Sequence, residues 1–356
     1  MLKMKLWSLS VIGLMCSLLS HADIQFSGFA SVVGGQTTSG KGDAFLADYS
    51  LVGLYDDDLS FQPETTMGLQ VIADLDLGLS FTSQWVSRGL NNFESEISYA
   101  YLSYKLSPEL TLQAGRKRLP LQYYSEFFDV GFAYPWIRPP ADLYTWQILN
   151  YNGISLDHKT RLGKGTIGTS LYIGREDSTN NRLMSTLFFN EETNETWKNI
   201  IGIRSDYSLG YFQALISYTN FKLDRSFTSP DSTEEPVSNS NVDFFATSFN
   251  FDNGQYLFLS EINHWASSRF AATNWLLSLG YQVNNFTPYM AFSEFSQEEK
   301  IANEDLEEHT TSSLGLRWDF HPQAAFKVQF DDIQDKGSLE LVGDAQAITF
   351  GIDLVF

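Results

Sequence analysis

Apolar side chains alternate with small or polar ones along most of this chain, and the last segment, Ala345 to Phe356, shows the pattern most clearly. A period of two residues is the repeat of a β-strand, which turns successive side chains to opposite faces. One face carries Ile348, Phe350, Ile352, Leu354 and Phe356, and the other carries Ala347, Thr349, Gly351, Asp353 and Val355. The chain therefore ends on a strand with one apolar and one mostly polar or small face.

The same alternation recurs in earlier segments, where apolar residues oppose mainly small or polar ones. The apolar sets are Met67, Leu69, Val71 and Ala73; Leu77, Leu79 and Phe81; Trp275, Leu277, Leu279 and Tyr281; Leu314, Leu316, Trp318 and Phe320; and Phe326, Val328 and Phe330. Trp and Tyr residues also lie in or near the ends of proposed strands, among them Trp85, Tyr104, Trp265 and Tyr281. Amphipathic rings favour a membrane–water interface, although aromatic residues also have a high β-propensity.

The breaks between these segments alternate between short turns and long polar loops. Short turns are predicted near Asp74–Asp76, Ser107–Glu109, Asp252–Gly254, Val283–Asn285 and His321–Gln323. Long loops are predicted near Gly35–Pro63, Leu119–Thr145, Arg175–Trp197, Lys222–Ser240, Ser296–Thr310 and Asp332–Asp344. Counting the segments between these breaks gives about 16 strands, an even number, as expected for a single-chain outer-membrane barrel. An extra strand pair is an open alternative around residues 43–55 and 183–190.

These strands favour an all-β fold, a transmembrane antiparallel β-barrel, over a secreted β-sandwich or β-helix. Nearly every strand has one apolar and one polar face, and the strands are too many for one sandwich. In hydrocarbon every backbone N–H and C=O group must be paired, and a closed barrel pairs them without leaving an edge. The apolar faces then meet lipid, and the polar faces meet a wet lumen.

The N-terminus has the pattern of a secretory signal peptide. Lys3 and Lys5 precede the apolar run from Leu6 to Leu19, and Ser20-His21-Ala22 is a small-x-small cleavage signal. We therefore predict a signal peptide over residues 1–22 and an outer-membrane barrel over residues 23–356. Cys16 follows Met15 rather than a small residue, which argues against lipoprotein processing. Removing residues 1–22 removes this only cysteine, so the exported chain forms no disulfide.

The charge balance excludes one class of partner. The precursor has 23 basic and 43 acidic residues, and loss of two lysines with the signal peptide leaves a net charge of −22. A nucleic-acid-binding protein needs a concentrated basic face, so no nucleic-acid partner is predicted. The mature sequence also lacks an apolar run of about 18 residues, which excludes a transmembrane helix but not a barrel.

The chain resembles the Gram-negative porin family in three features. The signal peptide leads directly into an alternating strand, Ile24 to Val33, and the chain ends on Phe356 with alternating apolar residues before it. The strand Leu110 to Arg118 contains Gly115-Arg116 and continues into a long third loop, as in general porins. The resemblance implies a 16-stranded homotrimeric barrel in the cell outer membrane that admits small hydrophilic solutes, with the third loop folded into the lumen. The family's acidic loop tip is absent, because residues 129–142 are rich in proline and aromatic residues.

The densest basic cluster is Arg116, Lys117 and Arg118. We predict a positive wall at the pore constriction, opposite the third loop with its charged residues Glu126, Asp129, Arg138 and Asp142, which together would order polar solutes in a transverse field. An alternative is contact with lipopolysaccharide phosphates at the rim. Strict alternation turns Arg116 outward and Lys117 inward, whereas the resemblance turns Arg116 inward, and a bulge at Gly115 would reconcile the two.

Other charged groups allow two interpretations each. Arg204, Arg317 and Lys327 lie on polar strand faces, where they would form a basic ladder lining the pore or pair with acids such as Asp319 and Asp331. Acidic runs in the predicted outer loops are expected to form a solvated, repulsive surface, and the alternative is that divalent cations bridge them to lipopolysaccharide. The runs are residues 56–58, 234–235, 298–299 and 304–308.

No catalytic constellation is predicted. The mature histidines are His158, His264, His309 and His321, and the one loose catalytic candidate is His264 with Glu261 and Ser267 nearby. Alternation places Glu261 and His264 on opposite faces, and no metal-ligand spacing or phosphate-binding glycine loop is present. The sequence thus predicts a passive outer-membrane porin without enzymatic activity or cofactor. The alternatives are a channel selective for anions or organic acids, and a structural or adhesive barrel.

Overall fold

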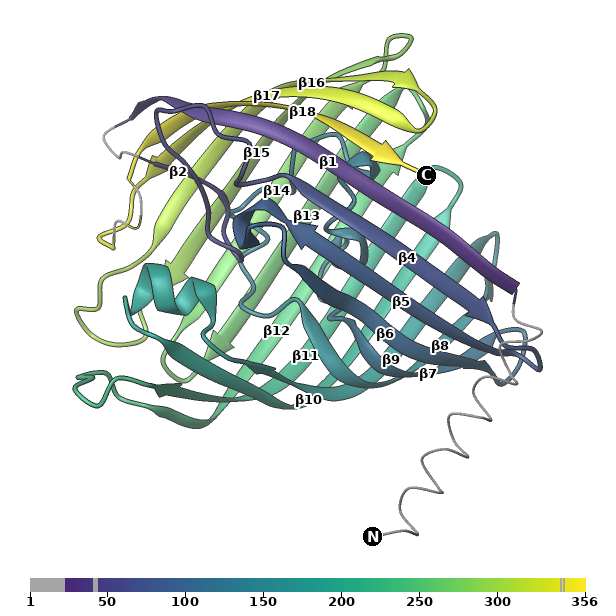
Figure 1. Ribbon diagram of the computed structural model, residues 1–356, viewed down its shortest axis with the longest axis horizontal. Coiled ribbons are helices and arrows are strands. Elements are labelled where there is room, and N and C mark those ends of the chain that lie inside the picture. The colour runs from purple at the N-terminus through teal and green to yellow at the C-terminus, as the bar shows by residue number, and fades with distance from the viewer. Residues whose placement is uncertain (1–22, 41–43, 340, 342) are drawn as a thin grey trace, which may run out of the picture.

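The computed structural model describes all residues except 1–22, 41–43, 340 and 342. The predicted signal peptide lies outside the described residues and stays a prediction. Among the described residues, sixteen strands close into one antiparallel barrel (Figure 1). They are β1 (Asp23–Gly40), β4 (Thr66–Asp74), β5 (Leu79–Arg88), β6 (Ser95–Lys105), β7 (Leu110–Arg118), β8 (Asn150–Leu162), β9 (Gly165–Ser178), β10 (Thr193–Leu209), β11 (Phe212–Phe227), β12 (Val237–Asp252), β13 (Tyr256–Ser267), β14 (Ala271–Tyr281), β15 (Phe286–Glu298), β16 (Glu308–His321), β17 (Ala324–Asp335) and β18 (Ala345–Val355). The predicted fold class and strand number are confirmed.

The last strand closes the barrel against the first. β18 pairs antiparallel with β1, for example Ser31 with Asp353, and the terminal Phe356 exchanges backbone hydrogen bonds with Gly28 at 2.8 and 3.0 Å. The predicted faces of this strand are also confirmed, because Ile348, Ile352 and Leu354 are exposed on the outside while the residues between them are buried or partly buried. Closure leaves the sheet without a free edge, as hydrocarbon requires.

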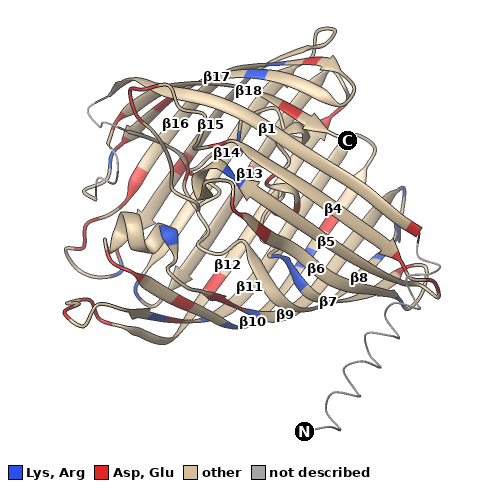
Figure 2. Ribbon diagram, in the orientation of Figure 1, with Lys and Arg blue, Asp and Glu red and all other residues tan. Residues whose placement is uncertain are grey.

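Short connections gather at one end of the barrel and most long ones at the other, the arrangement of an outer-membrane barrel with periplasmic turns and extracellular loops. The turns include residues 163–164, 210–211 and 253–255, and the longest loop, residues 119–149, joins β7 to β8. Leu77 was expected in a strand, but it lies in the β4–β5 turn with φ 54° and is exposed. Acidic residues are frequent in the connections at both ends (Figure 2).

The segments considered for an extra strand pair do not join the barrel. Residues 45–55 contain β2 (Phe45–Asp48) and β3 (Gly53–Tyr55), which form a separate two-stranded sheet. Residues 183–190 contain a short helical turn, η5 (Met184–Phe188). Further short turns are η2 (Gly89–Asn91), η3 (Ser125–Phe127) and η4 (Gly131–Ala133). Within the described part of the chain, every helix is too short or too polar to cross a bilayer.

The barrel interior is packed rather than empty. Buried tyrosine, tryptophan and phenylalanine side chains from strands between β8 and β15 point inward and meet residues of the third loop, while outward positions such as Ile203 and Ile216 are exposed. The outer surface is therefore apolar for lipid, and the inner surface combines polar groups with an aromatic core.

This division predicts the effect of charge on the outer wall. Ile203 of β10 is 42% exposed on the outside, whereas Asp206, three residues later, is exposed on the lumen side. We expect Ile203→Arg to lower the free energy of unfolding in lipid vesicles by about 2–4 kcal/mol, because it places a charge in hydrocarbon. Asp206→Arg, which introduces the same side chain on the wet face, serves as the control. Equal losses for the two variants would show that the faces are assigned wrongly.

Candidate functional site

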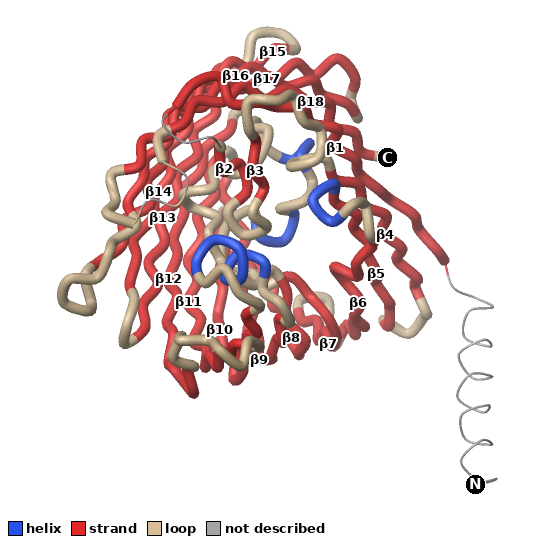
Figure 3. Tube along the Cα trace, turned by 60° about the vertical axis from the view of Figure 1, so that its left-hand side comes forward, coloured by secondary structure: helices blue, strands red, loops and turns tan. Residues whose placement is uncertain are grey.

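The third loop, residues 119–149, lies inside the ring of strands, where its short helical turns are visible (Figure 3). Its entering limb is fixed to the inner wall at β10, because Arg204 donates to the Gln122 carbonyl at 2.9 Å. Its middle reaches other strands: Trp136 Nε1 donates to Ser278 Oγ of β14 at 3.2 Å, and Ile137 N donates to Gln329 Oε1 of β17 at 3.0 Å. The loop therefore crosses the lumen, as expected from its position after β7.

Wall cations hold the loop by its backbone carbonyls. Lys327 donates to the carbonyls of Gly131 and Trp136, both at 2.6 Å, and its ammonium is 2.8 Å from the Asp353 carboxylate. Loop and wall approach so closely that a Cβ on Gly131 would lie 2.2 Å from Asp353 Oδ1. Lys327 is completely buried. This predicted pore-lining residue is therefore placed beneath the loop, where it satisfies carbonyls that have no strand partner.

Arg317 makes the same kind of contact from β16. It donates to the carbonyls of Phe132 at 2.8 Å and Tyr134 at 3.0 Å, lies over the Phe132 ring, and pairs with Asp319 at 2.8 Å. Together with Arg204 and Lys327, it was expected to form a basic ladder or to pair with nearby acids. Each of these cations lies on the inner wall, and each donates to the third loop.

A buried acid ties the loop to the strand that precedes it. The Asp129 carboxylate accepts hydrogen bonds from Arg88 Nη2 and Nε of β5, at 2.7 and 3.1 Å, and contacts Arg118 Nη2 of β7. All three side chains are at most 3% exposed. A desolvated charge needs a partner of opposite sign, so the Asp129 carboxylate and the guanidinium groups hold one another inside the barrel. Arg118 and Asp129, predicted to face each other, are brought together here.

Another cluster joins the third loop to the first. Arg138 Nη1 lies 3.1 Å from Asp48 Oδ2 at the end of β2, and Arg138 Nε lies 3.3 Å from Glu64 Oε1. Burial lowers the pKa of Arg138, but the Asp48 and Glu64 carboxylates outweigh it and raise that pKa above its ordinary value. Burial raises the pKa of Glu64, and the positive charge of Arg138 opposes this shift. Tyr55 of β3 completes the cluster by donating to Glu64 at 2.9 Å.

The returning limb is held by Asp142. Its carboxylate, fully buried, accepts from Ser293 Oγ of β15 at 2.6 Å and lies 2.7 Å from Nδ1 of His309 on β16. The other ring nitrogen of His309 is 3.1 Å from Glu307, whose carboxylate also accepts from the Tyr49 hydroxyl at 2.7 Å. Asp142 was predicted on the third loop, facing the basic wall of the constriction, and the structure places it in this buried network.

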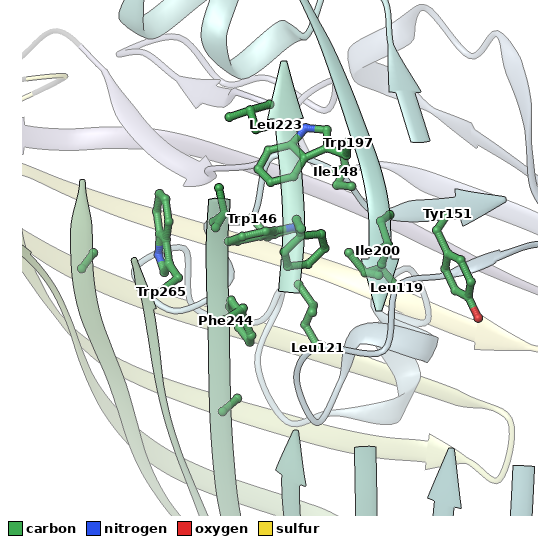
Figure 4. Packing of buried hydrophobic residues seen from close by; sticks show 14 of the residues in the cluster. Leu119, Leu121, Trp146, Ile148, Tyr151, Trp197, Ile200, Leu223, Phe244 and Trp265 are labelled. Carbon is green, nitrogen blue, oxygen red and sulfur yellow. The ribbon is translucent and has the colours of Figure 1, made fainter. Parts of the chain in front are cut away.

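Aromatic packing completes the attachment of the loop. Trp146 lies among rings from four strands, Trp197, Phe221, Phe244 and Trp265, at centroid distances of 5.0–5.3 Å (Figure 4). Full burial of such a side chain stabilises a fold by about 1.5–3 kcal/mol. Burial also raises the pKa of Tyr144 well above its ordinary value, so this phenol keeps its proton and donates to Glu261 at 3.2 Å.

Lys117 of β7 and Glu126 of the third loop carry opposite charges, and Lys117 is 8% exposed. Lys117 points inward from β7, where its ammonium lies 2.6 Å from Ser155 Oγ and 3.8 Å from Asp157. Glu126, in η3 of the third loop, has an exposed side chain, and its carboxylate and the Lys117 ammonium are near enough to interact electrostatically. This geometry opposes a negative loop group and a positive wall group.

Arg116 is oriented differently from Lys117. β7 pairs continuously with both neighbours through this region, and Arg116 shares the face of Ala114, although Gly115 has φ +140°. The Arg116 guanidinium is 2.8 Å from the Glu176 carboxylate and 2.9 Å from the Ile97 carbonyl. Arg116 thus contacts strand residues, and Lys117, the alternative given by strict alternation, points into the lumen.

Open space remains on either side of the third loop. A cavity of about 510 Å³ lies toward the short turns and is lined by residues such as Tyr211, Gly254 and Gln282. Another, of about 430 Å³, lies toward the long loops and is lined by residues such as Phe188, Glu234 and Arg269. The loop thus separates two vestibules, one at each end of the barrel.

Several anchoring residues were not singled out from the sequence. Four residues hold the loop through partners that are distant in the chain, namely Arg88, Asp48, Glu64 and Asp353. No local spacing in the sequence therefore marks them. The one available signal was the proline- and aromatic-rich composition of residues 129–142, which indicated a stiff, packed loop. That composition predicts packing but does not identify the wall residues that receive it.

The loose catalytic candidate is not assembled. Glu261 points inward, where it accepts from the Tyr123 backbone N–H at 3.1 Å and from Tyr144. His264 lies on the other face of β13, with Nδ1 3.0 Å from Thr273 Oγ1. The absence of enzymatic activity stays a prediction.

Comparison with known proteins connects this fold to outer-membrane channels. No protein-family model matches the sequence, and no curated protein matches it significantly. Among solved structures, the barrel is similar to Salmonella typhi OmpF in complex with daunomycin, with a TM-score of 0.64, 13% identity, and coverage of 94% of this chain and 97% of that one. It is also similar to the outer-membrane channel DcaP of Acinetobacter baumannii, with a TM-score of 0.61, 10% identity, and coverage of 95% and 98%.

A third similar structure is an anion-selective porin from Comamonas acidovorans, with a TM-score of 0.57, 12% identity, and coverage of 94% of this chain and 100% of that one. At these identities the likeness concerns the fold. The protein is an outer-membrane β-barrel with a porin-like fold, and the resemblance inferred from its sequence is confirmed at that level.

The Asp129 cluster yields a stability prediction. Asp129→Asn removes the carboxylate that two buried guanidinium groups share, which leaves Arg118 without its ion pair and Arg88 paired only with Glu96, so we expect the free energy of unfolding in lipid vesicles to fall by about 3–5 kcal/mol. Glu126→Gln makes the same chemical change at an exposed site of the same loop, and we expect it to have little effect. If both variants unfold at the denaturant concentration of the unmodified protein, Asp129 does not hold the loop.

Proposed function

We propose that this protein is a passive diffusion channel of the porin type for small hydrophilic solutes and ions. The observation that carries the proposal is the third loop, which crosses the lumen between vestibules of about 510 and 430 Å³. A structural barrel has no need for wet space on both sides of an internal loop. A loop held across the lumen by buried ion pairs narrows the path without depending on its own flexibility.

The constriction lies between the third loop and the wall formed by β6 to β9. Lys117 and Asp157 face the lumen on the wall, and Glu126 faces it from the loop. Opposite charges across a narrow aqueous passage create a transverse field that orients polar solutes and biases ion passage. Lys117 and Glu126 are therefore the proposed selectivity residues, while Asp129, Arg138 and Asp142 position the loop that carries Glu126.

The proposed setting follows from the outer surface. Exposed apolar positions such as Ile203, Ile216 and Ile352 contact lipid, and in the outer leaflet the acyl chains of lipopolysaccharide. We also propose a homotrimer, as the resemblance to general porins implies. Subunit-facing and lipid-facing strands are both apolar, so trimer assembly requires its own test, cross-linking in native membranes.

Conductance in planar bilayers tests the proposal. The purified protein should give stepwise currents, in which the current rises or falls by discrete steps. A folded barrel that inserts but carries no current would contradict the channel function and would favour the structural or adhesive alternative. Currents carried by only one ion class would favour the selective alternative.

Ion selectivity should follow the proposed residues. We expect Lys117→Ala to shift the reversal potential in a salt gradient toward cations, and Glu126→Ala to shift it toward anions, because each removes one side of the field. Lys164→Ala, in the exposed turn between β8 and β9, removes the same charge outside the constriction and should leave the potential nearly unchanged. Equal shifts for Lys117→Ala and Lys164→Ala would remove Lys117 from the constriction.

A further inference from the structure

The cavity of about 430 Å³ at the extracellular end has unusually apolar walls for a water-facing mouth. It lies between η5, residues 228–236, residues 268–270 and the upper parts of β10, β11 and β13. Its aromatic lining comprises Tyr49, Phe188, Phe189, Trp197, Phe227, Trp265 and Phe270. Concave apolar surface that stays open to water marks a ligand site more often than a packing defect, and this volume falls within the range of small-molecule pockets.

The aromatic walls are held in place by their neighbours. Trp265 stacks on Phe270 with centroids 4.2 Å apart, and Phe189 meets Phe227 edge-on at 4.9 Å. Trp197, at the base, is only 1% exposed. Rigid rings lose little conformational entropy when a flat apolar molecule binds between them, so the cavity is preorganised for such a molecule.

The charged residues that line the cavity are each paired or exposed to water, and the buried one among the acids, Glu307, accepts from the Tyr49 hydroxyl at 2.7 Å. Arg225 pairs with Glu195 at 2.7 Å, and Arg269 lies 3.5 Å from Glu235. Glu234, another lining carboxylate, is exposed to water. A charged ligand would have to give up its own hydration without gaining a free countercharge, which argues for an uncharged ligand.

One polar group of the cavity lacks a partner. The Trp265 indole N–H is buried and has no hydrogen-bond acceptor among the described residues. An unsatisfied buried donor costs about 1–3 kcal/mol, and a ligand oxygen would relieve that cost once the indole N–H, which has almost no exposed surface, turns toward the cavity. The apolar rings and the unpaired donor together specify a molecule with an apolar body and one hydrogen-bond acceptor.

The site is joined to the third loop. Trp197 and Trp265 line the cavity, and the same two rings pack against Trp146 of the loop, each at a centroid distance of 5.3 Å (Figure 4). A ligand seated on these rings therefore touches the support of the loop that forms the constriction.

We propose that this aromatic mouth cavity binds small uncharged aromatic molecules that carry a hydrogen-bond acceptor. The inference deepens the proposed channel function by naming a solute class that the channel captures at its extracellular end. Binding itself needs only the folded barrel, so it is measurable whether or not the protein conducts.

Equilibrium dialysis with three probes of one shape tests the proposal. The probes are 2-naphthol, 2-naphthoate and 2-naphthylmethylammonium, each measured against the full-length protein in detergent and against empty micelles. We expect saturable binding of 2-naphthol at one site, at least tenfold tighter than either ion. Tighter binding of either charged probe, or only the unsaturable uptake seen with empty micelles, would overturn the proposal.

Matched variants locate the site. Trp265→Leu should weaken 2-naphthol binding at least tenfold, whereas Trp318→Leu, on the outward face of β16, should leave it unchanged. If Trp265→Leu does not fold, Phe270→Ser tests the same stacked pair from the loop side. Equal affinities in the Trp265 or Phe270 variant and the Trp318 variant would overturn the site. Loss of 2-naphthol binding in a barrel that still conducts refutes this inference alone, and binding by a barrel that never conducts refutes the channel alone.

Discussion

The pairing of every backbone polar group inside hydrocarbon is the constraint on which this structure depends. It requires a closed sheet, and closure fixes two opposite environments, lipid outside and the lumen inside. Alternation along each strand then assigns every side chain to one of them. The same rule applies to the third loop, which has no strand neighbours once it enters the lumen. Its carbonyls accept instead from Lys327, Arg317 and Arg204, so the wall cations act as substitutes for a paired strand.

The same constraint explains why so many charges are buried inside the barrel. Asp129 with Arg88 and Arg118, Arg138 with Asp48 and Glu64, and Asp142 with His309 each join the loop to a different part of the wall. A buried ion pair adds little stability by itself, but its loss is costly, which makes it a device for fixing position. The loop is positioned by these pairs and by the aromatic packing around Trp146, and few charges remain free to meet a solute.

The barrel could be predicted from the sequence because apolar and polar side chains alternate along each strand, and this alternation indicates one face toward lipid and one toward the lumen. The closing strand and the short turns followed from local patterns, and the inward third loop followed from the resemblance to general porins. The role of Lys327 could not be predicted in this way, because the alternation of side chains along β17 gives the face of Lys327 but not the loop that covers it. Asp129 and Asp142 were expected at the pore, and only the three-dimensional path of the loop shows that their charges are already paired. The choice between Arg116 and Lys117 required the register of β7 with its neighbours.

The central claim is that the third loop forms the constriction of an open channel, and one measurement tests it directly. The predicted mature chain has no cysteine, so a Glu126→Cys variant has a single reactive thiol, at an exposed position of the loop. Thiol reagents of increasing size, added during single-channel recording, should lower the current in steps that deepen with reagent size. Complete modification of the thiol without any change in current would contradict the account, because the loop would then lie outside the path of the ions.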